Sequence, residues 1–148
     1  MVRKTRKINK YRRKGQSLIS ANKIQPELWQ ISNAEAKEAL LAIGLNVKDI
    51  KKIHKLKHQI CISFWDEKGG VCSGFFSYRI FARWQREVYR LIYCCVTLKD
   101  WQELSHIMKY EFAYYPYFCE VEDAINGELE YRLCVLNVTA RQAVLLDV

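Results

Sequence analysis

Eight of the first fourteen residues are lysine or arginine, and no acid occurs before Glu27. Such cations contact phosphate oxygens and displace the counterions that condense on nucleic acid. Because a block of like charges repels itself and buries little apolar surface, we expect this segment to be disordered when free. We call it the basic arm, and its cations are Arg3, Lys4, Arg6, Lys7, Lys10, Arg12, Arg13 and Lys14.

The alternatives for the basic arm are an acidic protein surface, a solubility tail or a targeting signal. A secretory signal needs an apolar stretch after its basic start, and only Leu18, Ile19 and Ala21 follow, interrupted by serines. A mitochondrial signal fits the scarcity of acids but not the density of lysine. Nucleic acid is therefore the leading hypothesis for the partner, with RNA and DNA both open.

Four arginines later in the chain repeat at helical spacing. Arg79, Arg83, Arg86 and Arg90 are separated by four, three and four residues, which predicts one stripe on a helix over residues 79–95. Guanidinium groups fork onto phosphate oxygens, so the stripe is a candidate phosphate-binding surface. The alternative is a solvated helix face that pairs with nearby acids.

A second basic cluster lies in residues 47–57, where apolar residues at near-helical spacing predict a short helix. This helix and one over residues 32–43, separated by Gly44, have the outline of a helix-turn-helix, although any αα-hairpin shares it. The cluster either extends the basic surface or is the solvated side of an amphipathic helix. It comprises Lys48, Lys51, Lys52, Lys55 and Lys57, with His54 and His58 beside them, and Lys48, Lys52 and Lys55 are candidate nucleic-acid contacts.

Potential metal ligands occur close to this cluster. Imidazole and thiolate groups bind zinc, and His54, His58, Cys61 and Cys72 are near one another in sequence. Their spacing matches no standard zinc motif, and reduced thiols in apolar surroundings are the favoured interpretation of the six cysteines. We expect no cofactor.

Catalytic signatures are weaker still. Acids on either side of Asn126-Gly127 predict an acidic hairpin tip that could hold Mg²⁺ in a nuclease, but no lysine stands at the strand spacing such a site requires. Glu103, His106 and Lys109 would align on one helix, as charged surface residues often do. An enzyme is therefore the third hypothesis, and the acids concerned are Glu120, Glu122, Asp123, Glu128 and Glu130.

An aromatic run at residues 112–118 predicts an edge strand, interrupted at Pro116. Exposed rings could stack on unpaired bases, but one face in the core and the other in a protein interface is the favoured interpretation. The second functional hypothesis is therefore a protein-interaction module or inhibitor that uses this strand and the acidic hairpin.

The elements that must position these residues form a mixed pattern. The chain has 148 residues, of which 50% are hydrophobic and 27% charged, so one domain with a real core is expected. Ser32 and Glu35 predict a capping box for the helix over residues 32–43, and Gly44 its end. Strands are predicted at residues 59–65, 71–78, 112–121 and 129–138, and helices at 79–95, 99–109 and 140–146.

The sequence thus predicts an α+β fold with two antiparallel β-hairpins and about four helices. Residues 1–26 are expected to be a flexible arm and connector, and residues 27–148 a single globular domain. The leading hypothesis is a small, non-enzymatic, nucleic-acid-binding protein, without a membrane span and located in the cytoplasm, or in the nucleus of a eukaryotic cell. The basic arm would attract the ligand, and the arginine stripe would recognise it.

Overall fold

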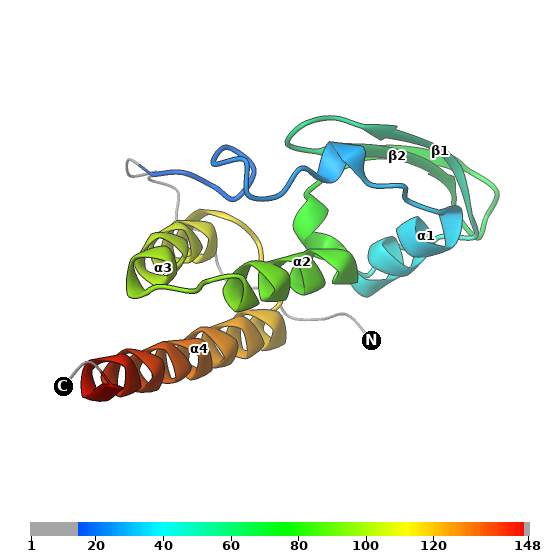
Figure 1. The fold of residues 1–148 in the computed structure, drawn as a ribbon. Coiled ribbons are helices and arrows are strands. Elements are labelled where there is room, and N and C mark those ends of the chain that lie inside the picture. The colour runs from blue at the N-terminus through cyan, green and yellow to red at the C-terminus, as the bar shows by residue number, and fades with distance from the viewer. Residues whose placement is uncertain (1–14, 147–148) are drawn as a thin grey trace.

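The computed structural model describes residues 15–146, with side chains to residue 142. The basic arm, its expected disorder and its eight cations therefore lie outside the described residues. Within these described residues, four α-helices and one three-stranded sheet form a single α+β domain, as predicted (Figure 1). In chain order the elements are η1 (Pro26–Leu28), α1 (Asn33–Ala42), β1 (Asp49–Lys55), β2 (Ile60–Trp65), β3 (Val71–Phe76), η2 (Tyr78–Ile80), α2 (Ala82–Tyr93), α3 (Leu98–Tyr114) and α4 (Cys119–Leu146).

The sheet is antiparallel with strand order β1-β2-β3, so its two hairpins share β2. Burial alternates along β2, where Ile60, Ile62 and Phe64 are buried and the residues between them are more exposed. Alternation of this kind marks a sheet with one face on the core and one toward solvent. Helix α1 packs beneath the sheet against β1 (Figure 1).

The helix predicted over residues 47–57 is wrong, because this segment forms β1. A shift in pairing register between Ile50 and Lys52 inserts one extra residue, Lys51, into the strand. Such a β-bulge changes which side chains share a face. Ile50 and Ile53 consequently both lie opposite inward-facing residues of β2, although a regular strand would direct them to opposite faces. Because of the bulge, Ile50 and Ile53 share a face although they are three residues apart. This spacing is close to that of a helix, which explains the wrong prediction.

The hairpin predicted around Asn126-Gly127 is also wrong, because both residues lie inside α4. Helix α3 runs through Tyr114, so residues 112–121 form no long strand, and residues 129–138 continue α4. Val121, Ile125 and Leu129 are buried at four-residue spacing. This apolar stripe packs against the neighbouring helices, and that packing overrides the local turn preference of Asn-Gly.

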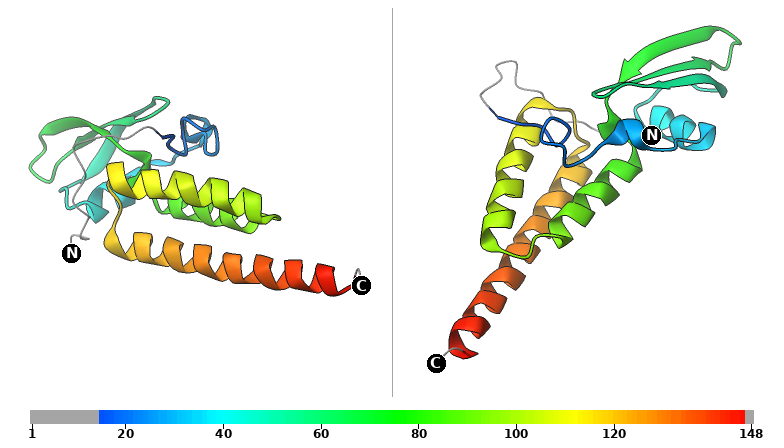
Figure 2. Two further views of the ribbon diagram at one scale, coloured as in Figure 1. Left: turned by 90° about the vertical axis from the view of Figure 1, so that its left-hand side faces the viewer. Right: turned by 45° about the horizontal axis from the view of Figure 1, so that its top comes forward.

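Helices α2, α3 and α4 pack on one another at the end of the molecule remote from β1, and α4 extends past the other two (Figure 2). Helix α2 buries Trp84, Val88 and Ile92, which follow one another at four-residue spacing along its inner face. No helix among residues 15–146 combines the length and apolar character needed to cross a bilayer.

Residues 17–24, which the sequence assigned to a flexible connector, pack into the core. Leu18, Ile19 and Ile24 are almost completely buried. The segment folds into tight turns, in which Ser17 and Ser20 exchange hydrogen bonds and Ala21 donates to the Ser17 carbonyl at 2.9 Å. It runs between α3 and the sheet, and so links the two halves of the molecule (Figure 1).

Both ends of α1 match the sequence prediction in position. The Ser32 side chain accepts a hydrogen bond from the Glu35 backbone at 3.1 Å, and Gly44 adopts a φ of 91° just beyond the helix. The Glu35 carboxylate, however, pairs with Arg83 instead of completing the capping box.

Candidate nucleic-acid interface

The solvent-facing side of the sheet combines exposed rings with basic side chains. We call it the open sheet face. Phe75 is 63% exposed and Trp65 is 36% exposed, a large apolar surface for residues of a small domain. The face also presents Lys51, Lys52, His54, Cys61, Ser63, Val71 and Ser73.

Cross-strand pairing arranges these residues in rows. His54, Cys61 and Phe75 form one row, and the next on the same face contains Lys52, Ser63 and Ser73. The two serine hydroxyls lie 2.8 Å apart, which leaves a flat polar strip between the two aromatic positions.

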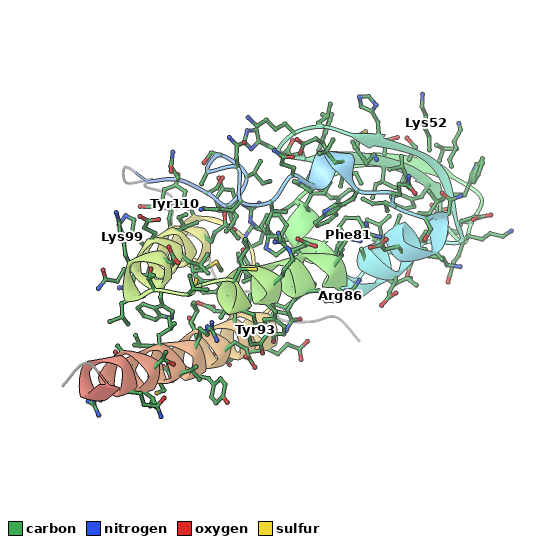
Figure 3. The ribbon with its side chains drawn as sticks, in the orientation of Figure 1. Lys52, Phe81, Arg86, Tyr93, Lys99 and Tyr110 are labelled. Atoms are coloured by element: carbon green, nitrogen blue, oxygen red, sulfur yellow. The ribbon has the colours of Figure 1, made fainter. Side chains whose placement is uncertain are left out.

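The aromatic ring at the other end of the face has a lysine over it. The Lys51 ammonium lies 5.8 Å from the centre of the Trp65 ring, within cation–π range. Asp49 pairs opposite Trp65, and Asp66 and Glu67 follow Trp65 in the β2–β3 turn, so acids also stand at this end of the face. Lys52 points away from the body of the molecule (Figure 3).

Of the remaining lysines of the predicted basic cluster, two are exposed to solvent and one is hydrogen-bonded within the protein. Lys48 and Lys57 are exposed beside the sheet. Lys55 is different, because its ammonium donates a hydrogen bond to the Trp29 carbonyl. Of the three candidate contacts proposed from this cluster, Lys48 and Lys52 are accessible and Lys55 has a structural partner.

The predicted arginine stripe does not exist as one solvent-facing surface. Arg79 lies in η2, before α2 begins, and is only 5% exposed. Arg83 donates to the Glu35 carboxylate at 2.6 and 3.0 Å and lies 5.4 Å from the Trp29 ring. The even spacing of the arginines failed as a guide because a 3₁₀ turn and Phe81 separate the first from the helix.

The other two arginines of the stripe are exposed on α2. Arg90 pairs with Glu87 at 3.0 Å, one turn earlier on the same helix. Arg86, labelled on α2 in Figure 3, lines a small pocket together with Glu35 and Glu38, so acids stand beside it. Three of the four arginines therefore pair with carboxylates, namely Arg79, Arg83 and Arg90. A phosphate-binding row of four guanidinium groups is not formed.

Arg79 belongs to a buried polar network. Its guanidinium forms two hydrogen bonds with the Glu111 carboxylate, at 2.6 and 2.7 Å. Burial opposes the charge on Arg79, but the hydrogen bonds and charge of Glu111 outweigh it and raise the arginine pKa. Tyr117 donates to the same carboxylate at 2.5 Å and accepts from the Trp84 indole at 2.9 Å. Burial, reinforced by the charge of Glu111, raises the pKa of Tyr117 well above its usual value.

A cleft of about 650 Å³ opens between the β1–β2 turn, the segment at residues 17–20 and the C-terminal end of α3. We call it the tyrosine cleft. Gly15 lies against the ring of Tyr110, one of its lining residues, so the basic arm joins the domain at this cleft. Its lining residues are Ser17, Ser20, His58, Gln59, Ser77, Arg79, Tyr110, Tyr114, Tyr115 and Pro116.

The aromatic run at residues 112–118 is mostly core. Phe112, Tyr114, Tyr117 and Phe118 are buried, and the Phe112 and Tyr117 rings meet edge to face at 4.9 Å. The part of the interpretation that assigned rings to the core is confirmed, whereas the exposed strand edge assumed for a protein partner is not formed.

The acids assigned to a hairpin tip lie along α4, where successive side chains point in different directions. Glu122 is buried, and Glu128 accepts a hydrogen bond from Tyr93 at 2.6 Å.

His54 and Cys61 are cross-strand neighbours on the open sheet face, but Cys72 pairs opposite the inward-facing Phe64. Within residues 15–146, no three His, Cys, Asp or Glu side chains gather closely enough to hold a metal ion.

Sequence reasoning missed the two exposed rings, Trp65 and Phe75. Both strands were predicted, and the alternation along them was the signal that could have revealed the exposed rings, because it puts Trp65 on the side of β2 opposite Phe64.

Comparison of the chain with protein-family models, curated proteins and solved structures finds no match.

Proposed function

We propose that this protein is a non-enzymatic nucleic-acid-binding protein whose fixed binding surface is the open sheet face. The observation that supports this proposal is the exposure of Phe75 and Trp65 beside Lys51 and Lys52 on one face of an antiparallel sheet. Aromatic rings on such a sheet stack on bases, and lysines between and beside them contact phosphates.

Electrostatics favour the same surface. Lys51 and Lys52 lie in the edge strand β1 and Lys48 immediately precedes it, with Asp49 as the acid among them. Edge-strand lysines also block unwanted pairing with other sheets, so their presence alone would be ordinary. Their combination with two exposed rings is what favours a ligand that is both anionic and aromatic.

The basic arm would add contacts that do not depend on sequence. Each phosphate neutralised releases counterions, so affinity should fall steeply as salt rises. The proposal excludes Arg79 and Arg83 from the interface, because both guanidinium groups bind carboxylates inside the protein. Recognition is thereby assigned to the sheet and not to α2.

The test is a titration of labelled RNA and DNA, single-stranded and duplex, over a series of KCl concentrations, followed by fluorescence anisotropy. Replacing Lys51 and Lys52 with glutamine should reduce the slope of log affinity against log salt by about 1.4 to 1.8, because each lost phosphate contact removes roughly 0.7 to 0.9. Deleting residues 1–14 should reduce the slope further.

The matched control is the double variant Lys99→Gln and Arg141→Gln, which removes the same charge from exposed positions on α3 and α4. Lys99 lies on the side of the molecule away from the sheet (Figure 3). Equal effects of the two double variants would contradict the assignment to the open sheet face. Absence of salt-dependent binding to every nucleic acid would contradict the function itself, and a protein that stays bound at high salt after nuclease treatment would favour the interaction-module alternative.

A further inference from the structure

The tyrosine cleft lies where the open sheet face ends. His58 and Gln59, in the turn that joins β1 to β2, form one wall. The row containing His54 and Phe75 is separated from this turn by a single row of strand residues, Lys55, Ile60 and Phe76. A strand of nucleic acid lying along the open sheet face would therefore reach the cleft at the hairpin end.

The cleft contains an arginine but is not built as a phosphate site. Both oxygens of the Glu111 carboxylate bind the Arg79 guanidinium, and Arg79 also donates to the Ser77 hydroxyl at 3.2 Å. The guanidinium carbon lies 3.7 Å from the centre of the Tyr115 ring, so this ring covers one of its faces. Because its charge is balanced within the protein, Arg79 adds little attraction for an anion.

The remaining lining suits a neutral aromatic ligand. Tyr110 lies 4.8 Å from Tyr114 and 6.2 Å from Tyr115, measured between ring centres, so three rings gather at one end. Gln59 and His58 offer amide and imidazole groups that can donate to or accept from the edge of a base. The volume of about 650 Å³ falls within the range of small-ligand pockets, which typically combine apolar walls with a few polar groups.

We propose that the tyrosine cleft binds an unpaired nucleobase at one end of a single strand that crosses the open sheet face. This inference rests on the proposed function and narrows its ligand to single-stranded nucleic acid, because a paired base cannot enter the cleft or stack on Phe75. Phosphates remain outside, near Lys52 and Lys57, while bases face the protein.

The test compares a single strand of about eight nucleotides with two versions that lack the base at one terminal position but keep every phosphate. Each is titrated against the wild-type protein by fluorescence anisotropy, using DNA and RNA in parallel. Removing the base at one of the two ends should weaken binding at least about fivefold, the loss expected for one stacked base. The matching duplex should bind more weakly than the intact strand.

The protein variant for this test is His58→Ala with Gln59→Ala, since both residues are exposed. It should bind the intact strand about as weakly as wild type binds the affected abasic strand, and should no longer distinguish those two strands. The matched control, Gln102→Ala with His106→Ala, removes the same side chains from the exposed surface of α3 and should behave as wild type.

Two outcomes would overturn the inference while the proposed function stands. In one, the strand binds with the expected salt dependence but the terminal bases do not matter. In the other, the cleft variant still distinguishes intact from abasic strands. If neither strand nor duplex binds at low salt, the proposed function fails together with the inference.

Discussion

Replacing Glu111 with glutamine should strongly destabilise the protein, although the two side chains have nearly the same shape. Glu111 is fully buried, and its two oxygens accept four hydrogen bonds. Two come from Arg79, one from Tyr117 and one from the Leu18 backbone at 3.0 Å. Glutamine removes the negative charge and also places an amide donor where donors already converge.

The size of the effect follows from the charge that is left behind. Breaking a buried ion pair by neutralising one partner costs about 3 to 5 kcal/mol, because the other charge stays in a poorly solvating interior. Natural domains are stable by only about 5 to 15 kcal/mol. For a chain of this size the melting temperature should fall by roughly 10 to 15 °C. Protection of the Leu18 amide against hydrogen exchange should be lost as well.

Urea unfolding and thermal melts followed by circular dichroism measure this change. The control is Glu35→Gln, which breaks the Glu35–Arg83 pair, also at 2.6 Å but with both side chains partly exposed. Exposed pairs contribute about 0 to 1 kcal/mol, so this variant should stay near wild type. If the two variants lose similar stability, the reasoning that burial makes the Arg79–Glu111 pair indispensable is refuted.

Three further predictions concern the stability of the folded domain. Burial, with the nearby charge of Glu27, raises the pKa of Tyr78 to about 12. The folded state therefore keeps a proton that the unfolded chain loses near pH 10, so urea unfolding should show stability declining from pH 10 to 12, less steeply in Tyr78→Phe. Thr97→Ala removes the capping box of α3, in which the Thr97 hydroxyl accepts from the Asp100 backbone at 3.1 Å, and should cost about 0.5 to 2 kcal/mol in urea unfolding. Ile62→Ala in the central strand should cost about 2 to 5 kcal/mol by the same measurement, and a loss below 1 kcal/mol would show that the site collapses around the missing atoms.

Local signals succeeded where one short stretch of chain decides the structure. Ser32 begins α1 as its hydroxyl predicts, because a cap needs only a backbone N–H two or three residues away. The β2–β3 hairpin followed from two apolar runs around Gly69, whose φ of 83° the turn requires. A helix was also predicted over residues 79–95, and α2 occupies Ala82–Tyr93 of that range.

Local signals failed where distant packing competed with them. Asn126-Gly127 is a strong turn signal, yet it lies within α4 because the apolar residues on either side pack against other helices. The bulge at Lys51 produced a helical spacing inside a strand that only its pairing with β2 reveals. In both cases long-range contacts contribute more free energy than local preference does.

The residues of the candidate site were likewise predicted only in part. The sequence by itself determined that one end of the chain is strongly basic and that a lysine-rich segment follows the first helix, because charge is a property of composition. Only the tertiary structure decided which cations are accessible. It buried Arg79 on Glu111, paired Arg83 with Glu35, and left Lys51 and Lys52 beside two exposed rings. A charge is neutralised or exposed by residues far away in the sequence, and spacing along one segment does not reveal them.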